Sequence, residues 1–194
     1  MSMFKLTLWK GTSFLAIDPG INHTGFAHYK IGMQGELALR DYGAISLAKD
    51  DLDNLERAGI IVDSVMAHIN EKRPAFMLLE RPPNTIYYQG RLDMKNIIAR
   101  AQNVFKVVGI TYAISARVRT LTGFRCFPID PAKWQERSPK KRLGLSIKDW
   151  SIKLANSIIT QTTSNPANLG SERDENIADA ISMGWIAFGL GMAG

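Results

Sequence analysis

At residues 14–20 the sequence reads Phe14-Leu15-Ala16-Ile17-Asp18-Pro19-Gly20: four apolar residues run into a single carboxylate and then into a Pro-Gly turn. A short apolar run bounded by turn residues is typical of a buried strand. We therefore expect Asp18 at the exposed end of a core strand, held on a rigid backbone. One acid is not a catalytic site, so the next question is which other acids could reach it.

Four further strands are expected along the chain. Residues 24–31 and 36–47 follow the first strand after turns, which indicates an antiparallel meander. An apolar run at residues 75–79 predicts another strand, and this strand ends in Glu80. A short fifth strand is expected at residues 125–129. Two of the five strands therefore end in an acid.

Four helices are expected between and after these strands. Acids at positions 50, 51 and 53 favour the start of a helix that Pro74 stops, and Ser146 with Asp149 resembles a capping box. A long helix runs on from position 94, residues 160–172 are a polar loop, and the last helix starts near Asp174. The apolar stripes expected to face the core are Leu55, Val62, Val65, Met66 and Ile69 in the first helix, and Met94, Ile97, Ile98, Ala101, Val104, Phe105 and Val108 in the second.

Length and composition favour one domain. The chain has 194 residues, of which 45% are hydrophobic, and this suits a single domain with its own core. No internal repeat and no long linker divides it. We expect one domain over residues 1–194, with a lead-in at 1–12 and a flexible tail at 189–194.

The charge and the cysteine content indicate which class of partner and which cellular compartment to expect. A formal net charge of +6 favours a polyanionic partner without proving one. Cys126 is the only cysteine, so no internal disulfide can form and a reducing compartment fits. No apolar run approaches the roughly 20 residues of a membrane span. We therefore expect an intracellular, cytoplasmic protein with no membrane partner.

Three acids share one unusual placement. Asp18 and Glu80 end apolar strands, and Asp179 lies near the start of an otherwise apolar helix. An acid on an apolar scaffold costs desolvation unless a cation compensates. Each acid alone is adequately explained by solvent or an ion pair, but three together in a basic chain favour a divalent metal site. Mg²⁺ takes carboxylate oxygens, and two such ions about 3.5–4 Å apart can activate water and stabilise the leaving oxygen in phosphodiester cleavage.

The last helix offers candidates for a fourth ligand. Glu175 precedes Asp179 by four residues and Asn176 precedes it by three, so each lies near its helical face. Glu175 carries the charge that Mg²⁺ prefers. Asp174 is rotated off that face and is better explained as an N-cap. The choice between these residues stays open, with a slight preference for Glu175.

These motifs resemble a known family. Residues 14–20 with Thr24-Gly25 look like the first strand and turn of RuvC-type Holliday junction resolvases. Leu78-Leu79-Glu80 resembles their second acidic strand end, and Ala178-Asp179-Ala180 resembles their C-terminal acidic motif. The likeness covers about residues 13–188. The order and placement of the three acids carry most of its specificity.

The resemblance implies a fold and an activity. The fold would be α/β and ribonuclease H-like, with a mixed five-stranded sheet flanked by helices. The activity would be Mg²⁺-dependent cleavage of four-way junctions in branched DNA by a homodimer, with Mn²⁺ able to substitute. The resemblance makes Asp18, Glu80 and Asp179 catalytic acids and metal ligands. Glu175 is added to the catalytic acids and ligands for its charge, and Asn176, which holds the family's position, is a further candidate metal ligand. The implied location is the cytoplasm near the nucleoid, or the host cell if the protein is phage-encoded.

The sequence departs from the family pattern at several points. Asn176 stands where the family usually has an acid or a histidine, so either Asn176 is a weaker ligand or Glu175 replaces it. Pro83 stands where the family can carry an aromatic residue that stacks at the junction. Tyr87 and Tyr88 could take over that role or be surface-packed loop residues. A longer interval between Glu80 and Asp179 suggests a phage-encoded or divergent member.

Cationic residues provide candidate DNA contacts. The densest cluster lies in the basic loop at residues 133–142. Its functional interpretation is phosphate contact with little sequence information, and its alternative is a solvated loop. Trp134 could stack on a base or anchor packing. The candidate DNA-binding residues are Arg81, Tyr87, Tyr88, Lys133, Arg137, Lys140, Lys141, Arg142 and Lys148.

Other functions remain possible on the sequence alone. A nuclease of the same fold could act on RNA or on other DNA branches. A DNA-binding module could keep the scaffold without catalysis, in which case its junction binding would not depend on Mg²⁺. A sugar or acetate kinase-like phosphotransferase would need a second Gly-rich phosphate turn about halfway along, and none is found.

Overall fold

The protein is built on one five-stranded sheet. A computed structural model describes residues 10–47, 52–82, 94–121, 123–135, 144–163, 168–170 and 174–192. Within these residues the strands are ordered β3-β2-β1-β4-β5. β1 (Ser13–Asp18) lies at the centre, which is where its apolar sequence predicts it.

The sheet is mixed. β1 pairs antiparallel with β2 (His23–Ile31), and β2 pairs antiparallel with β3 (Leu37–Ser46), so the predicted meander is confirmed. β4 (Phe76–Glu80) lies parallel to β1, and β5 (Arg125–Ile129) lies parallel to β4. The carboxyl ends of β1, β4 and β5 therefore meet at one edge of the sheet.

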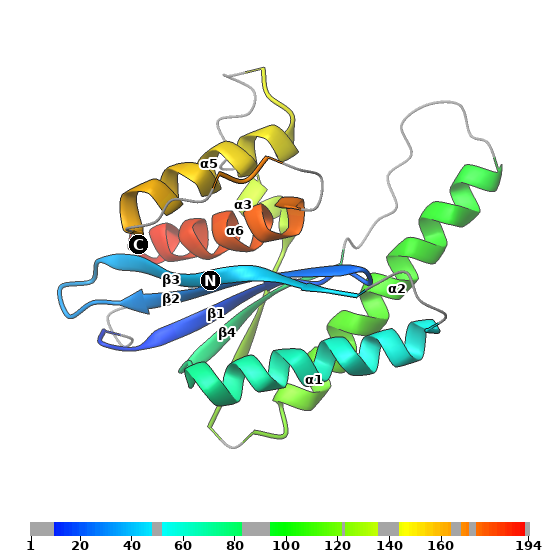
Figure 1. The fold of residues 1–194 in the computed structure, drawn as a ribbon, viewed down its shortest axis with the longest axis horizontal. Helices are drawn as coiled ribbons and strands as arrows, with labels where there is room; N and C mark the ends of the chain where they lie inside the picture. The colour runs from blue at the N-terminus through cyan, green and yellow to red at the C-terminus, as the bar shows by residue number, and fades with distance from the viewer. Residues whose placement is uncertain are drawn as a thin grey trace.

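Helices cover both faces of the sheet (Figure 1). α1 (Asn54–Lys72) and α2 (Met94–Val118) lie on one face. α5 (Ile147–Thr162), α6 (Glu175–Met192) and the short α3 (Pro131–Gln135) lie on the other. Because strand side chains alternate between faces, β1 contributes Phe14 and Ala16 to the core under α6, and Leu15 and Ile17 to the core under α1 and α2.

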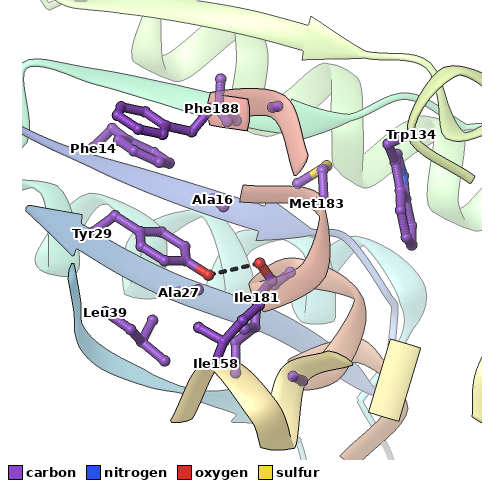
Figure 2. Packing of buried hydrophobic residues seen from close by; sticks show 14 of the residues in the cluster. Phe14, Ala16, Ala27, Tyr29, Leu39, Trp134, Ile158, Ile181, Met183 and Phe188 are labelled. Atoms are coloured by element: carbon purple, nitrogen blue, oxygen red, sulfur yellow. Dashed lines mark hydrogen bonds between the residues drawn. The ribbon is translucent and has the colours of Figure 1, made fainter. Parts of the chain in front are cut away.

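The core under α6 is tightly packed (Figure 2). The Phe14 ring stacks on Tyr29 at 5.1 Å and on Phe76 at 5.0 Å between centroids. The buried Tyr29 hydroxyl donates a 2.6 Å hydrogen bond to the Ile181 carbonyl of α6. A Cβ at Gly184 would lie 2.5 Å from the Tyr29 ring, so only glycine lets α6 approach this closely. These contacts fix α6 against β1 and β2.

Two predicted helix starts have clear local causes. Asp53 is the N-cap of α1, and its side chain accepts hydrogen bonds from the backbone of Leu55 and Glu56, while the Glu56 carboxylate accepts one from the Asp53 backbone N–H. Ser146 caps α5, which confirms the predicted start of that helix. The acids at positions 50 and 51 lie outside the described residues.

Several predicted apolar positions are wrong. Leu55 is 81% exposed, Ile98 is 51% exposed and Phe105 is 71% exposed. In α2 the buried face is carried by Ile110 and Ile114, because the first half of the helix extends past the edge of the sheet (Figure 1). An amphipathic stripe shows which side of a helix can be buried, but not how far along the helix a sheet covers it.

Smaller boundary corrections follow from hydrogen bonding. The basic loop predicted at 133–142 begins as α3, whose start is held by a 3.0 Å hydrogen bond from the Ala132 backbone to the Asp130 carboxylate. The polar loop predicted at 160–172 starts later, because α5 continues to Thr162. The predicted tail from position 189 is helical as far as Met192. No helix in the described part of the chain is both long and apolar enough to cross a membrane.

Candidate functional site

Asp18 and Glu80 meet at the carboxyl edge of the sheet. Ile17 of β1 is in register with Leu79 of β4, so the next residue on each strand is an acid. Because successive side chains of a strand point to opposite faces of the sheet, both acids point to the face that α6 covers. Ala16 and Leu78, two residues earlier on each strand, point to the same face. Their side chains share a hydrogen bond. The two carboxyls therefore form a pair on neighbouring rigid strands, as the strand ends predict.

Asp179 approaches this pair from α6. Its sequence neighbours Ala178 and Ala180 are fully buried, which fixes the first turns of α6 against the sheet. One carboxylate oxygen of Asp179, Oδ1, is buried without a hydrogen-bond partner among the described residues. A buried, unpartnered carboxylate oxygen is costly, so it marks a place where a cation would be stabilising.

Burial raises the pKa values of all three acids, and the charge of Asp179 also raises those of Asp18 and Glu80. Burial raises the pKa of Asp18 well above its ordinary value, and the charges of Glu80 and Asp179 raise it further. Burial raises the pKa of Glu80 to about 7, although hydrogen bonds with Asp18 and Trp134 lower it. Burial raises the pKa of Asp179 to about 6, against a hydrogen bond with Ser151 that lowers it. When the three acids are ionised, their negative charge is therefore larger than the surrounding protein compensates.

The carboxylate oxygens of the three acids are suitable ligands for a hard divalent cation. The acids are not, however, positioned to bind one ion together. Among the described residues, no group of three or more His, Cys, Asp or Glu side chains is positioned to hold a metal ion as it stands. Asp18 and Glu80 are hydrogen-bonded to each other rather than spread around a common centre. Carboxylate oxygens are nevertheless the ligands that Mg²⁺ takes, and raised pKa values are expected where the compensating cation is lacking.

The three candidates for a fourth ligand have different partners. Glu175 forms an ion pair with Lys148 of α5, and its charge raises the pKa of Asp179. The Asn176 side-chain nitrogen donates a hydrogen bond to the His23 carbonyl at the start of β2. The Asp174 carboxylate accepts a 3.1 Å hydrogen bond from the Gly170 backbone. Glu175 is thus electrostatically linked to Asp179, whereas the amide of Asn176 ties α6 to the turn after β1.

The predicted DNA-binding residues are distributed around this edge. Arg81 directly follows Glu80 and is exposed, and Lys133 is exposed on α3. Lys148 is also exposed, but its ammonium group is paired with Glu175. The remaining predicted residues, Tyr87, Tyr88, Arg137, Lys140, Lys141 and Arg142, lie outside the described residues.

Trp134 has a role at the site that the sequence left undecided. It is only 1% exposed and stacks on Trp150, with 6.3 Å between ring centroids, so it is a packing anchor. Its indole nitrogen donates a 3.4 Å hydrogen bond to the Glu80 carboxylate. Ser151 was missed altogether, because a serine inside an amphipathic helix carries no sequence signal for contact with Asp179.

The arrangement of the whole chain matches solved resolvase structures. It superposes on the structure of Thermus thermophilus RuvC in complex with Holliday junction substrate with a TM-score of 0.59, covering 93% of this chain and 96% of that one at 15% identity. The chain has the RuvC fold. The predicted α/β, ribonuclease H-like architecture, with its mixed five-stranded sheet, is thereby confirmed.

Two other structures share the RuvC fold with this chain. The yeast mitochondrial Holliday junction resolvase Ydc2 has a TM-score of 0.60 at 13% identity, over 95% of this chain and 82% of that one. The fowlpox virus Holliday junction resolvase has a TM-score of 0.54 at 14% identity, over 89% and 94%. No protein-family model and no curated protein sequence matches the chain. At these identities the likeness establishes the RuvC fold and nothing finer.

Proposed function

We propose that this protein is a structure-selective endonuclease that resolves four-way DNA junctions by phosphodiester hydrolysis. The observation that carries the proposal is the meeting of Asp18 and Glu80 at one sheet edge, with Asp179 close enough to raise the pKa of both. Solved proteins that share the fold include resolvases, one of them bound to a Holliday junction. A basic chain with a buried, uncompensated carboxylate cluster suits a polyanionic substrate and a divalent cation.

Each residue would have a distinct role. Asp18, Glu80 and Asp179 would hold Mg²⁺, for which Mn²⁺ could substitute, with Glu175 or Asn176 as the fourth ligand. When bound in such a site, divalent ions activate water and stabilise the charge that develops on the leaving oxygen. Trp134 orients the Glu80 carboxylate by its hydrogen bond, and Ser151 favours the ionised form of Asp179. Arg81 and Lys133 would contact phosphates beside the cleaved bond.

A homodimer is part of the same proposal. A four-way junction has two strands to cut, so two copies of the site would act on one substrate. Phe105 and Leu55 are exposed apolar side chains beside a cavity of about 660 Å³ between α1 and α2, and they offer a surface for a second copy. Molar-mass measurement of Phe105→Glu beside the wild-type protein tests this, with a monomeric variant as the expected result.

The test of function compares labelled four-way, Y-shaped and linear DNA and an RNA–DNA hybrid as substrates. We expect cleavage of the four-way junction only when Mg²⁺ or Mn²⁺ is present. Asp18→Asn, Glu80→Gln and Asp179→Asn should each abolish cleavage while junction binding and folding stay nearly intact. Full activity in one of these variants would remove that residue from the site.

The same experiment separates the alternatives. Equal cutting of an RNA–DNA hybrid or of other branches would indicate a different nuclease of this fold. Junction binding that is independent of Mg²⁺, with no nicking under any condition, would indicate a DNA-binding module. For the fourth ligand, Glu175→Gln should raise the Mg²⁺ requirement more than Asn176→Ala does, and the reverse order would assign the role to Asn176.

A further inference from the structure

A groove lies on the face of the sheet opposite the acids. It has a volume of about 390 Å³ and runs between α2 and strands β4 and β5. The residues that matter here are Arg81, Tyr112, Ser115, Arg119 and Cys126, all of which line it. We call it the α2 groove. Its volume falls within the range of about 300–1,000 Å³ that is usual for small-ligand pockets, so it can take a group much larger than a simple ion.

Strand alternation explains why the groove forms there. Glu80 points to the α6 face, so the next residue, Arg81, points to the α2 face. Cys126 of β5 pairs with Met77 of β4 and lies on the same side. Ile114 and Val118 of α2 are buried in the core, while Ser115 of α2 and Arg119, which directly follows the end of α2, line the groove. One helix thus presents a core face and a polar face.

The groove is cationic. Two guanidinium groups, Arg81 and Arg119, line it, and no acidic side chain is among its described lining residues. Both arginines are exposed, and neither forms an ion pair within the described part of the chain. Burial raises the pKa of the Cys126 thiol to about 11, and the nearby charge of Arg119 lowers it by a smaller amount. The positive field of Arg119 therefore reaches into the groove.

The position of Arg81 connects the groove to the acids. Arg81 follows Glu80 directly in the chain, so the groove begins at the same edge of the sheet at which Asp18 and Glu80 meet. A nucleic-acid strand whose phosphate lies at the acids can pass over this edge onto the α2 face. Guanidinium groups bind phosphate oxygens with two parallel hydrogen bonds, and the 69%-exposed ring of Tyr112 is available for base stacking.

We propose that the α2 groove binds the backbone of the DNA strand that continues from the cleavage site, with Arg81 and Arg119 each contacting a phosphate. The proposal rests on the proposed function, because it takes the acids as the cleavage site. It adds Arg119, Ser115 and Tyr112 to the substrate path and places that path on both faces of the sheet. Arg119 acts in positioning the DNA and not in the chemical step.

The first test measures the salt dependence of junction binding without divalent cations. Arg119→Ala should weaken binding several-fold and reduce the slope of log affinity against log salt by about one, the loss of one phosphate contact. Arg117→Ala is the matched control, because it removes the same charge two residues earlier, in the last turn of α2, and Arg117 does not line the groove. Arg119→Lys should retain most of the slope. Equal losses in Arg119→Ala and Arg117→Ala would overturn the proposal.

The second test uses the chain's single cysteine as a reporter of the groove. Alkylation of Cys126 by a maleimide at pH 8.5, followed by intact mass, should slow several-fold when junction DNA is saturating. The same concentration of inorganic phosphate should give no protection. Unchanged alkylation with DNA bound would show that the strand does not enter the groove. Protection by inorganic phosphate equal to that by DNA would overturn the assignment to a DNA strand.

These outcomes are distinguishable from failure of the proposed function. Both tests measure binding and need no cleavage. If the protein cuts junctions normally but shows neither effect, the proposed function stands and the groove is not a DNA-binding surface. If the protein shows both effects but never nicks DNA, the groove is a DNA-binding surface and the proposed activity is wrong.

Discussion

The Trp134 indole donates a hydrogen bond to the Glu80 carboxylate, and this contact explains why a buried tryptophan lies next to a cluster of acids. Trp134→Phe keeps most of the ring volume and removes the donor. The 3.4 Å bond is long, so its loss should cost about 0.5 kcal/mol, at the low end for a hydrogen bond. Because this hydrogen bond lowers the pKa of Glu80, its loss should raise that pKa.

The expected result is a shift in the pH dependence of cleavage. Protons and a metal ion compete for the same carboxylate, so the acid limb of the profile should move to higher pH at a fixed, subsaturating Mg²⁺ concentration. Trp150→Phe is the control, because Trp150 stacks on Trp134, whereas the indole that donates to Glu80 is that of Trp134. An identical shift in both variants would mean that ring packing, and not the indole donor, sets the effect.

At the scale of elements, the start of α6 is seated directly on β2. A Cβ on Gly25 would overlap the backbone carbonyl of Asn176, and Asn176 is bonded in turn to the His23 carbonyl. A backbone atom cannot rotate out of the way, so α6 must move if the space is filled. The Thr24-Gly25 pair, noticed in the sequence as a family motif, therefore has a steric reason.

Gly25→Ala should displace the first turn of α6 and with it Asp179. We expect a loss of about 1–3 kcal/mol in the free energy of unfolding, as for other overpacked cores, together with a large loss of cleavage. Gly59→Ala is the control in α1, where a Cβ meets nothing within 4 Å. It should stabilise the protein by about 0.5–1 kcal/mol. Thermal unfolding of the two variants gives the comparison, and a fully active, stable Gly25→Ala protein would contradict it.

The strands were predictable from the sequence because each is an apolar run bounded by turn residues, and each acid at a strand end follows from that boundary. The pairing of Glu175 with Lys148 was not predictable, because the two residues lie on different helices. The contact of Asn176 with the His23 carbonyl is a tertiary contact across 153 positions of the chain. Local sequence patterns thus predicted the placement of the three central acids. The contacts of Glu175 and Asn176 were not predictable, because they depend on how α5 and α6 cross the sheet.

At the scale of the whole molecule, the acid cluster should make the stability of the metal-free protein depend on pH. Asp179 and Glu80 have folded-state pKa values of about 6 and about 7, whereas unfolded acids titrate near 4. Between these values the folded state binds more protons than the unfolded state. The free energy of unfolding should therefore fall as pH rises from about 4 to 7, by an amount on the order of a few kcal/mol.

Melting temperatures measured in a chelator at several pH values test this expectation. The difference between wild type and Asp179→Asn isolates the cluster, because all other carboxylates are common to both proteins. The variant should lose less stability over this range, and added Mg²⁺ should restore stability to the wild type at pH 7 and above. Parallel curves for the two proteins would show that the pKa of Asp179 is not raised in the folded protein.

The docking of α6 also bears on the order in which the protein becomes complete during its synthesis. Asp179 lies on α6, and that helix covers Ala16 and Tyr29 on a sheet whose five described strands are all translated before it. A nascent chain that has not yet released α6 can pair its strands, but it leaves one face of the sheet exposed and lacks the third acid. A chain that stops before residue 175 would therefore be prone to aggregation and would carry only two of the three acids of the proposed site.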